Sequence, residues 1–348
     1  MFGRADMPIG EVAHSPSRRQ PLSRPRSKQV YTPLEDDMRM RFRRIAIGLA
    51  AVLAVLFGAS VSVAYAWEPP GVELPSRYLS RVDSRYVDTD LARFHYTVSG
   101  SGSPVVLIAG GGLWGYSWRE VLPELAREHT VYAVDLPSQG YTELRTADFA
   151  YDLPAMSNAI ATFLDAVGLD RAALVGHSWG GAWSLYFAEQ HPQRVDRLVL
   201  LDSPGLDAEK APITPVFKAP VLGELTTKLT TRSFYADSIR GTFNHQDLVT
   251  DELIDEFYPP FSRPANRDGF LALWRNLDYR LTDAALSEVT APTLVLWGGD
   301  DQWLPSSQAT RLAARIPHAE AVVLPGCGHT VHEDCPTTTI PLIATFLD

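Results

Sequence analysis

Apolar and polar positions divide the chain into two regions, with a boundary near residue 45. Residues 1–40 are rich in Pro, Ser and Arg and lack sustained apolar periodicity, a composition typical of disorder. From Ile45 to Trp67 no residue is charged, so every face of a helix there would be apolar. Such a helix is long enough to cross the roughly 30 Å hydrocarbon layer of a bilayer. The pattern predicts a disordered basic tail over residues 1–44 and a transmembrane anchor over residues 45–67.

Beyond a Pro-rich linker at residues 68–82, short apolar runs alternate with helical patterns. Strands are predicted at residues 85–89, 93–98, 104–109, 130–135, 172–175, 197–201, 293–297 and 321–324, with a hairpin joining the first two. Helices are predicted at residues 120–128, 153–167, 181–190, 306–315 and 338–347. Continuous apolar runs such as residues 104–109 indicate strands buried on both faces. The alternation predicts an α/β protein with a doubly wound, mostly parallel sheet.

A long segment interrupts this alternation. Residues 205–285 lack strong strand signals and contain Pro and Gly breaks between helical runs, for example at residues 251–258 and 267–277. An insertion of this kind predicts a helical cap on a core formed by residues 83–204 and 286–348. We therefore expect one capped domain after the anchor.

Charge adds an orientation to this picture. Ten Lys and Arg against five Asp and Glu give residues 1–44 a net charge of +5, so the remainder carries −15 of the total of −10. Arginines precede the apolar run and none follows it closely, which predicts a cytoplasmic N-terminus and an extracytoplasmic C-terminal region. The acidic remainder argues against a nucleic-acid partner. The sequence leaves the oligomeric state open.

An alternative to the anchor is a cleaved signal peptide. Ala64-Tyr-Ala66 has the small-x-small form of a signal-peptidase site, and cleavage after Ala66 would release the protein. The apolar run is longer than the roughly 7–15 residues of a typical signal peptide and follows an unusually long tail. Both features favour a retained anchor.

The most informative motif lies between a predicted strand and a predicted helix. Gly176-His-Ser178-Trp-Gly180 fits the G-x-S-x-G pattern, in which a serine occupies a sharp turn and its glycine neighbours let strand and helix approach. The turn exposes the serine oxygen and directs the next backbone N–H, that of Trp179, at a developing oxyanion. The motif predicts Ser178 as a nucleophile.

A serine nucleophile needs a base, and the base needs an acid that orients it. Asp300 and Asp301 follow the end of a predicted strand, and His329 lies in a loop after the next strand. The chain order Ser, Asp, His is the order that this type of elbow requires. Carboxyl ends of parallel strands are also where open α/β sheets bind ligands.

With these residues the chain resembles the α/β-hydrolase family from about residue 85 to residue 348, with the cap matching least. The resemblance implies Asp301 as the acid, with Asp300 the local alternative and Asp202 a more distant one. It implies His329, rather than His332, as the base. His332 is expected to face the first turn of the element that follows.

The resemblance also places a second oxyanion donor in the loop after residues 104–109. Relatives carry His-Gly there, whereas this chain has Ala109-Gly-Gly-Gly112, so we expect the N–H of Gly111, or else that of Gly112. Asp135 occupies a turn whose family pattern is altered at its centre, and we interpret it as structural.

Rival hypotheses use other residues. Gly110, Gly112 and Gly115, with Asp135 at the end of the next strand, fit a dinucleotide-binding fingerprint and would indicate an NAD(P)-dependent oxidoreductase. That hypothesis leaves the Ser, Asp and His series unexplained. A non-catalytic binding protein on the same fold is the second rival. Metal donors near His329 and His332 lack the H-E-x-x-H order, so no metal is expected. A serine mechanism in which water removes the acyl group implies no cofactor.

Cysteines and tryptophans supply two further expectations. Cys327 and Cys335 flank the predicted base, and an exported domain would permit a disulfide between them, although the sequence does not decide it. An acyl pocket could be lined by an aromatic set: Trp114, Trp118, Trp179, Trp274 and Trp303.

These inferences predict a membrane-anchored serine hydrolase that cleaves a small acyl substrate through Ser178, His329 and Asp301. A carboxylic ester is the least demanding substrate. Hydrolysis of a C–C bond, a lactone or an amide, or cofactor-free peroxidase-like chemistry, are the alternatives on the same fold.

Overall fold

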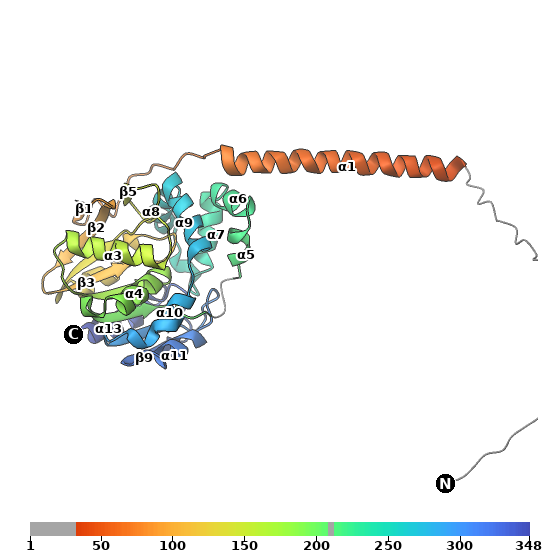
Figure 1. The fold of residues 1–348 in the computed structure, drawn as a ribbon. Helices are drawn as coiled ribbons and strands as arrows, with labels where there is room; N and C mark the ends of the chain where they lie inside the picture. The colour runs from red at the N-terminus through yellow and green to blue at the C-terminus, as the bar shows by residue number, and fades with distance from the viewer. Residues whose placement is uncertain (1–32, 208–211) are drawn as a thin grey trace, which may run out of the picture. The chain divides into compact units, whose positions relative to one another are not determined.

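The structure, a computed structural model, describes residues 33–207 and 212–348 (Figure 1). The chain divides into the units Met1–Leu56 and Phe57–Asp348. The second unit contains the sheet, its covering helices and the inserted cap.

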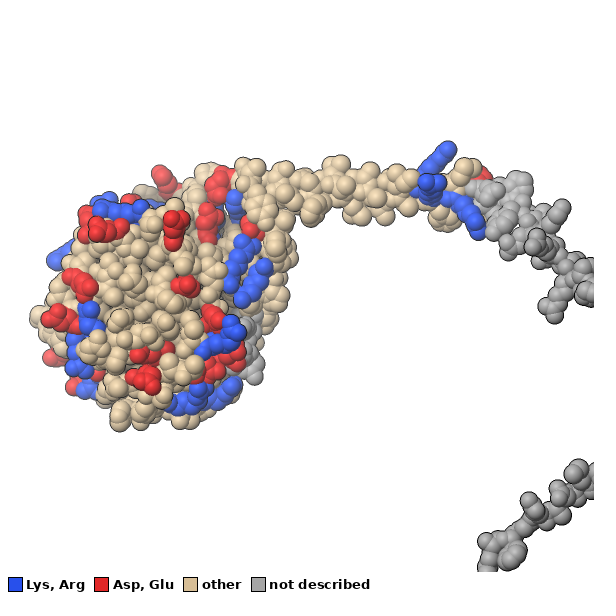
Figure 2. Space-filling model, in the orientation of Figure 1, with Lys and Arg blue, Asp and Glu red and all other residues tan. Residues whose placement is uncertain are grey.

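The first helix, α1 (Pro33–Ala66), contains a stretch from Asp37 to Ala66 that is long and apolar enough to cross a membrane. Figure 2 shows a run without charged side chains after a basic group at its start. The helix begins at Pro33, so the prediction of a disordered tail was wrong for residues 33–44, while residues 1–32 lie outside the described part. An i,i+4 ion pair between Asp37 and Arg41, 2.9 Å long, favours the helix there.

One nine-stranded sheet forms the centre of the second unit. Its strands are β1 (Ser84–Asp88), β2 (Ala92–Gly100), β3 (Ser103–Ile108), β4 (His129–Val134), β5 (Glu143–Leu144), β6 (Ala172–His177), β7 (Val195–Leu201), β8 (Thr293–Gly298) and β9 (Ala319–Leu324). The order is β1-β2-β4-β3-β6-β7-β8-β9, with β5 paired to β2. The strands from β4 to β9 along this order are parallel, and β1 and β2 form the expected antiparallel hairpin. The predicted doubly wound, mostly parallel sheet is confirmed.

Alternate residues of the central strands belong to two separate apolar cores. Val106 and Ile108 of β3 pack with α3 (Leu153–Ala166), α4 (Trp179–Gln190) and α11 (Ser307–Ala313) on one face. Val105 and Leu107 pack with α2 (Val121–Leu125) and α13 (Pro336–Leu347) on the other. Because side chains of a strand alternate between faces, a strand with both sets apolar is buried on both sides. Because helices cover both faces, a functional site is expected at the ends of the strands.

Predicted helix positions are reproduced, with differences at the ends. The helix expected at residues 120–128 is shorter, since α2 ends at Leu125 and backbone turns follow it. The two-residue strand β5 carried no recognisable pattern because it is too short to show one. Four-residue α12 (Val331–Asp334) precedes α13.

The insertion between β7 and β8 is helical, as predicted. It contains α5 (Thr214–Lys218), α6 (Leu222–Lys228), α7 (Arg232–Arg240), α8 (Asp251–Phe261), α9 (Pro264–Asn276) and α10 (Arg280–Ala285). These helices extend from Thr214 to Ala285. An apolar core between α7, α8 and the loop after β3 joins the cap to the sheet domain.

The segment expected to be a linker is bound to the cap through a buried carboxylate. Glu256 of α8 is 5% exposed, and its oxygens accept hydrogen bonds from Ser76 Oγ at 2.6 Å, Arg77 N at 2.8 Å and Tyr78 N at 3.1 Å. An acidic side chain satisfied by these donors holds the chain that leads from α1 into the sheet domain.

Replacing this carboxylate tests its contribution to stability. We expect Glu256→Gln to lower the free energy of unfolding by about 1–3 kcal/mol, because an amide cannot accept all three hydrogen bonds. Urea unfolding of the full-length chain measures the change. Glu252→Gln, an exposed position on the same helix, is the control and should be nearly neutral. Equal midpoints for the two variants would contradict the assignment.

Candidate active site

Ser178 occupies a strained turn between β6 and α4. Its φ is +49°, a conformation that non-glycine residues rarely adopt. A Cβ on Gly180 would lie 2.3 Å from the carbonyl oxygen of Ile108, and one on Gly176 would lie 2.5 Å from the carbonyl oxygen of Gly180. Only glycine permits this approach of helix to strands, and the approach presents the Ser178 side chain at the sheet edge.

The structure brings Ser178, His329 and Asp301 together from the ends of three strands. His329 Nε2 lies 3.0 Å from Ser178 Oγ, and His329 Nδ1 lies 2.8 Å from Asp301 Oδ2. A carboxylate only accepts hydrogen bonds, so Nδ1 carries the proton and Nε2 of the neutral ring accepts from the serine hydroxyl. These are the contacts that nucleophilic activation of a serine requires.

Asp301 is held by donors on every side. Its Oδ1 accepts the N–H groups of Trp303 at 2.7 Å and Leu304 at 3.0 Å, and its Oδ2 accepts from Trp297 Nε1 at 3.0 Å. Burial would raise the pKa of Asp301, but His329 and these backbone donors outweigh it and lower the pKa below its usual value. Asp300, the local alternative, is exposed and does not contact His329 through any described hydrogen bond.

Asp202, the more distant alternative, lies beside the same group without binding the imidazole. It is fully buried, and it accepts the N–H of Gly298 at 2.7 Å and of Val331 at 3.2 Å. Burial and the neighbouring Asp301 raise its pKa well above the usual value. The carboxyl group is thus used to fix the two loops that carry Asp301 and His329.

Two buried histidines lie behind His329: His177, which the sequence did not single out, and His332, which was the less favoured base. His177 donates from Nε2 to the backbone oxygen of His329 at 3.0 Å, and burial, with His329, lowers its pKa to about 3. His332 stacks on Trp118, and its Nε2 lies 2.9 Å from Ser117 Oγ. Burial and His177 lower the pKa of His332 well below its usual value. Only the position of His177 next to the nucleophile could have indicated its role.

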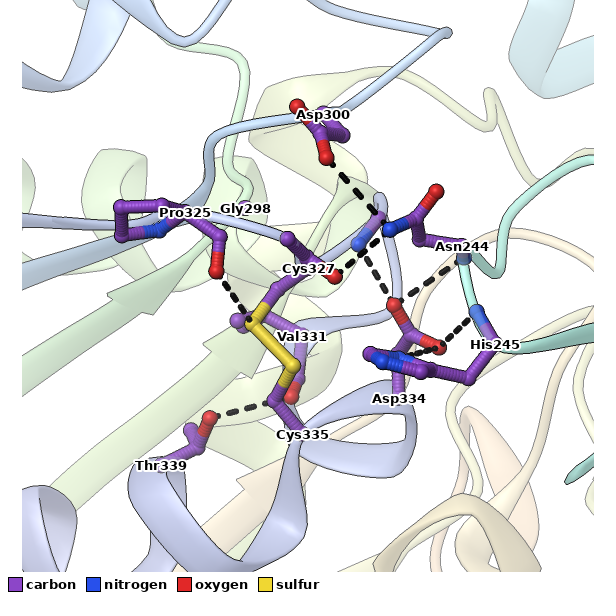
Figure 3. The surroundings of a disulfide bond; sticks show 12 residues. Asn244, His245, Gly298, Asp300, Pro325, Cys327, Val331, Asp334, Cys335 and Thr339 are labelled. Carbon is purple, nitrogen blue, oxygen red and sulfur yellow. Dashed lines mark hydrogen bonds and ion pairs between the residues drawn. A yellow bond between two sulfur atoms is a disulfide. The ribbon is translucent and has the colours of Figure 1, made fainter.

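A disulfide between Cys327 and Cys335 closes the loop that carries His329 (Figure 3). The two Cα atoms are 5.9 Å apart. Cys335 lies directly before α13, so the bond fixes the His329 loop to the start of a helix that packs on the sheet.

A buried carboxylate within this loop reaches into the cap. Asp334 accepts the N–H groups of Gly328 at 2.6 Å, Asn244 at 3.0 Å and His245 at 2.8 Å (Figure 3). The cap chain after α7 is thereby bonded to the loop of His329. Sequence reasoning missed Asp334 because its partners in the cap, Asn244 and His245, lie about 90 residues away in the chain.

A cavity of about 460 Å³ opens above Ser178, between the sheet edge and the cap. Its aromatic lining consists of Trp179, Phe217, Phe234, Tyr235, Phe261, Phe270, Trp274, Tyr279 and Trp303. Apart from histidines, the charged side chains in the described lining are Lys218 and Asp237. The interior is therefore suited to a neutral, apolar group.

The aromatic set expected around the cavity is only partly there. Trp179, Trp274 and Trp303 line it. Trp114 is buried and donates from Nε1 to the backbone oxygen of Glu256 at 2.9 Å, and Trp118 is buried against His332. Burial in the core explains both exceptions.

Gly111, Gly112 and Trp179 also line the cavity beside Ser178. In the described part of the chain, neither the Gly111 nor the Trp179 backbone N–H binds an intramolecular acceptor. A Cβ at Gly111 would lie 2.2 Å from the Trp179 ring, so this loop packs directly on the residue after the nucleophile. Two unpaired donors beside one hydroxyl suit a developing oxyanion.

The residues of the dinucleotide fingerprint serve the fold. Asp135 is fully buried, with Oδ1 accepting from Gly115 N at 2.8 Å and Oδ2 bonded to His95 Nδ1 at 2.7 Å and Tyr141 N at 3.0 Å. A Cβ at Gly140 would lie 1.8 Å from this carboxylate. Both carboxylate oxygens are bonded within the fold, so Asp135 is structural.

Two groups of metal-type donors occur among residues 33–207 and 212–348. Asp202, Asp301 and His329 form one, but their atoms are already used in the hydrogen bonds described above. The other contains Cys335, whose sulfur is in the disulfide. Neither set offers the free donors that metal binding needs.

Comparison with known proteins agrees with this fold. The chain belongs to the alpha/beta hydrolase fold family, whose model matches residues 103–336. It is 33% identical over 265 residues to 2-hydroxy-6-oxo-2,4-heptadienoate hydrolase of Pseudomonas putida, covering 71% of this chain and 90% of that protein.

Two solved structures show the same fold. A meta-cleavage product hydrolase from Pseudomonas fluorescens, an S103A mutant complexed with acetates, matches with a TM-score of 0.65 and 24% identity over 75% of this chain and 96% of its own. A membrane phospholipase A, a novel bacterial virulence factor, matches with a TM-score of 0.66 and 24% identity over 88% of this chain and 98% of its own. Because the family and these relatives are named as hydrolases, the chain is identified as a hydrolase.

The low pKa of His177 predicts a loss of stability in acid. Between its usual pKa of 6.5 and the folded value of about 3, the unfolded chain binds more protons, so the free energy of unfolding falls as pH drops below 6.5. At pH 5 the cost is about 2 kcal/mol.

We expect His177→Asn to reduce the difference in unfolding free energy between pH 7 and pH 5 by this amount, measured by urea unfolding at both pH values. Exposed His318→Gln is the control and should behave as the wild type. An unchanged pH dependence in His177→Asn would refute the assignment.

Proposed function

We propose that this protein is a serine hydrolase in which Ser178 is the nucleophile, His329 the general base and acid, and Asp301 the group that orients the imidazole. The observation that carries the proposal is the continuous hydrogen-bonded series Ser178–His329–Asp301 at the floor of an apolar cavity. No cofactor enters the proposed reaction.

The proton positions define each step. Ser178 Oγ attacks the substrate carbonyl carbon while its proton passes to His329 Nε2. The imidazolium that forms is stabilised by Asp301 through Nδ1–H. Collapse of the tetrahedral intermediate expels an alcohol, which takes the proton from Nε2 and leaves an acyl-serine. A water molecule then repeats the sequence and releases the acid.

The N–H groups of Trp179 and Gly111 are proposed to receive the oxyanion. Both residues line the cavity beside Ser178, and neither N–H has an intramolecular acceptor among the described residues. Trp179 begins α4, whose N-terminal partial positive charge favours an anion at the same place. Gly112, with φ of +75°, is the alternative donor in this loop.

For the substrate we propose a carboxylic ester with a neutral, apolar acyl group. The cavity lining is largely aromatic and aliphatic, and Lys218, its one basic side chain apart from histidines among the described residues, is exposed. Burying a substrate carboxylate there would leave it without a buried cationic partner, which is costly.

Carbon–carbon hydrolysis is the second candidate, and the names of the relatives favour it over ester hydrolysis. A 2-hydroxy-6-oxo-2,4-heptadienoate contains no ester or amide, so its hydrolysis must break a carbon–carbon bond. The same catalytic residues suit this reaction, because Ser178 could attack the 6-oxo carbon. The dienoate carries a carboxylate, for which the described cavity lining provides no buried cation.

We further propose that α1 is retained as an anchor, with the N-terminus cytoplasmic and the hydrolase unit outside. Support comes from the arginines before the apolar stretch and from the disulfide at Cys327 and Cys335, a bond that persists in oxidising compartments.

Replacement of the oriented acid tests the mechanism. We expect Asp301→Asn to reduce kcat by about 10⁴-fold, because the amide favours the wrong imidazole tautomer. Asp300→Asn, its exposed neighbour, should stay within about twofold of the wild type. A fluorophosphonate probe should label the wild type and leave Ser178→Ala unlabelled. Labelling of Ser178→Ala, or equal rates for the two aspartate variants, would refute the proposal.

A substrate panel separates the two candidate bonds. We expect kcat/KM for nitrophenyl esters to rise by at least about tenfold from acetate to octanoate, as the acyl chain fills the apolar cavity. Dienoate cleavage, followed by its absorbance, should be undetectable. Ser178→Ala corrects for background in both assays. Faster turnover of the dienoate than of any ester would establish the carbon–carbon reaction instead.

A further inference from the structure

The end of α1 is packed on the cap within the unit Phe57–Asp348. Ala64 is 1% exposed, and with Tyr65 it lines a pocket whose other walls are side chains of α6 and α9. Tyr65 Oη accepts a hydrogen bond from the backbone N–H of Val221, directly before α6, at 3.2 Å. The apolar helix therefore ends in contact with the cap.

The residues that follow the helix are also bonded to the cap. Lys228, at the end of α6, donates to the backbone oxygen of Trp67 at 2.9 Å and pairs with Glu68 at 2.9 Å. Arg267 of α9 pairs with Glu68 at 2.5 Å. No free length of chain separates the last turn of α1 from α6, so α6 stays wherever that turn leaves a bilayer.

Large apolar side chains are exposed on α6 and α7 beside these contacts. Leu222 is 48%, Leu229 55% and Phe234 57% exposed. Leu222 follows Val221 and Leu229 follows Lys228, so each flanks a residue that binds the end of α1. Leu222 begins α6 and Leu229 directly follows its last residue, so the two leucines are seven residues, about two helical turns, apart. We call Leu222, Leu229 and Phe234 the apolar rim.

The helices that carry the apolar rim also form the wall of the cavity. Thr226, Thr227 and Thr230 line the cavity from α6 and the turn after it. Phe234 both lines the cavity and is largely exposed, so it stands at the mouth. The opening that leads to Ser178 is thus bordered by Phe234, the member of the apolar rim that lines the cavity.

We propose that the apolar rim rests in the surface of the bilayer that holds α1, and that the substrate is a membrane-dissolved acyl ester that enters the cavity directly from the lipid. The proposal rests on the serine hydrolase function given above. Tyr65 and Trp67, 57% and 44% exposed, are of the residue types that collect at the membrane–water interface. Their contacts hold the rim at that level.

The contacts of α1 with the cap indicate that the partner of the apolar rim is the bilayer. An exposed apolar patch at the mouth of a cavity marks an interaction surface, and here it adjoins the end of a helix of membrane-spanning length. Long-chain esters partition into the bilayer, more strongly with each methylene. A mouth at the lipid surface lets such a chain pass from one apolar medium into another without crossing water.

Paired substrates test delivery from the bilayer. Full-length protein in phosphatidylglycerol–phosphatidylethanolamine vesicles is given a water-soluble nitrophenyl butyrate or a long-chain acyl ester dissolved in the same vesicles. We expect Leu222→Glu/Leu229→Glu to lose at least about tenfold of the rate on the vesicle substrate and to keep the butyrate rate. Neither leucine lines the cavity.

The matched control is Leu281→Glu/Val323→Glu, at exposed apolar positions on α10 and β9, which Figure 1 shows away from α6. This variant should keep both rates. An unchanged vesicle rate in Leu222→Glu/Leu229→Glu, or an equal loss on both substrates, would overturn the proposal.

A second measurement reads membrane contact without turnover. The fluorophore nitrobenzoxadiazole is attached to Leu229→Cys or to Leu281→Cys, with Cys327 and Cys335 protected in their disulfide. In nanodiscs holding one copy of the chain, we expect blue-shifted emission from the fluorophore at position 229. At position 281 we expect the emission wavelength of a fluorophore in water. Aqueous emission at both, or a shift at 229 only in discs with two copies, would overturn membrane docking. If the wild type cleaved neither ester while the shift at 229 remained, the hydrolase proposal alone would fail.

Discussion

The close approach of α4 to the ends of β3 and β6 is the constraint on which the site depends. Gly176 and Gly180 have no space for a Cβ, so helix and strands meet at backbone distance. The turn between them forces Ser178 to a φ of +49°, a strain that the packed sheet and helix maintain. The same turn points the Ser178 hydroxyl at His329 and places Trp179 in the lining of the cavity. A wider turn would separate these groups.

Burial then sets the charges around this turn. Asp202 and Asp301 lie side by side, yet only Asp301 bonds to the imidazole and has a lowered pKa, whereas burial and Asp301 raise that of Asp202. The buried His177 and His332 have lowered pKa values, so they pack behind His329 as neutral rings. The imidazolium proposed to form during the reaction would therefore face one carboxylate and no competing cation from these rings.

Periodicity and motif spacing predicted much of this from the sequence, because they depend on local geometry. Apolar runs identified the parallel strands, and the Gly-x-Ser-x-Gly spacing located the turn at Ser178. Short elements such as β5 and α5 carry too few residues for a pattern. The helical start of α1 at Pro33 was missed, because composition outweighed the favourable charge spacing of Asp37 and Arg41.

The sequence alone determined the fold class, the apolar helix and the residues Ser178, Asp301 and His329 as candidates, since strand order brings the ends of parallel strands to one edge. Only the tertiary structure showed that Asp301, rather than Asp300 or Asp202, contacts the His329 imidazole, at 2.8 Å. It also decided that Asp334 binds the cap to the His329 loop and that the end of α1 lies against α6. These contacts join residues far apart in the chain, and local sequence patterns do not predict contacts between such residues.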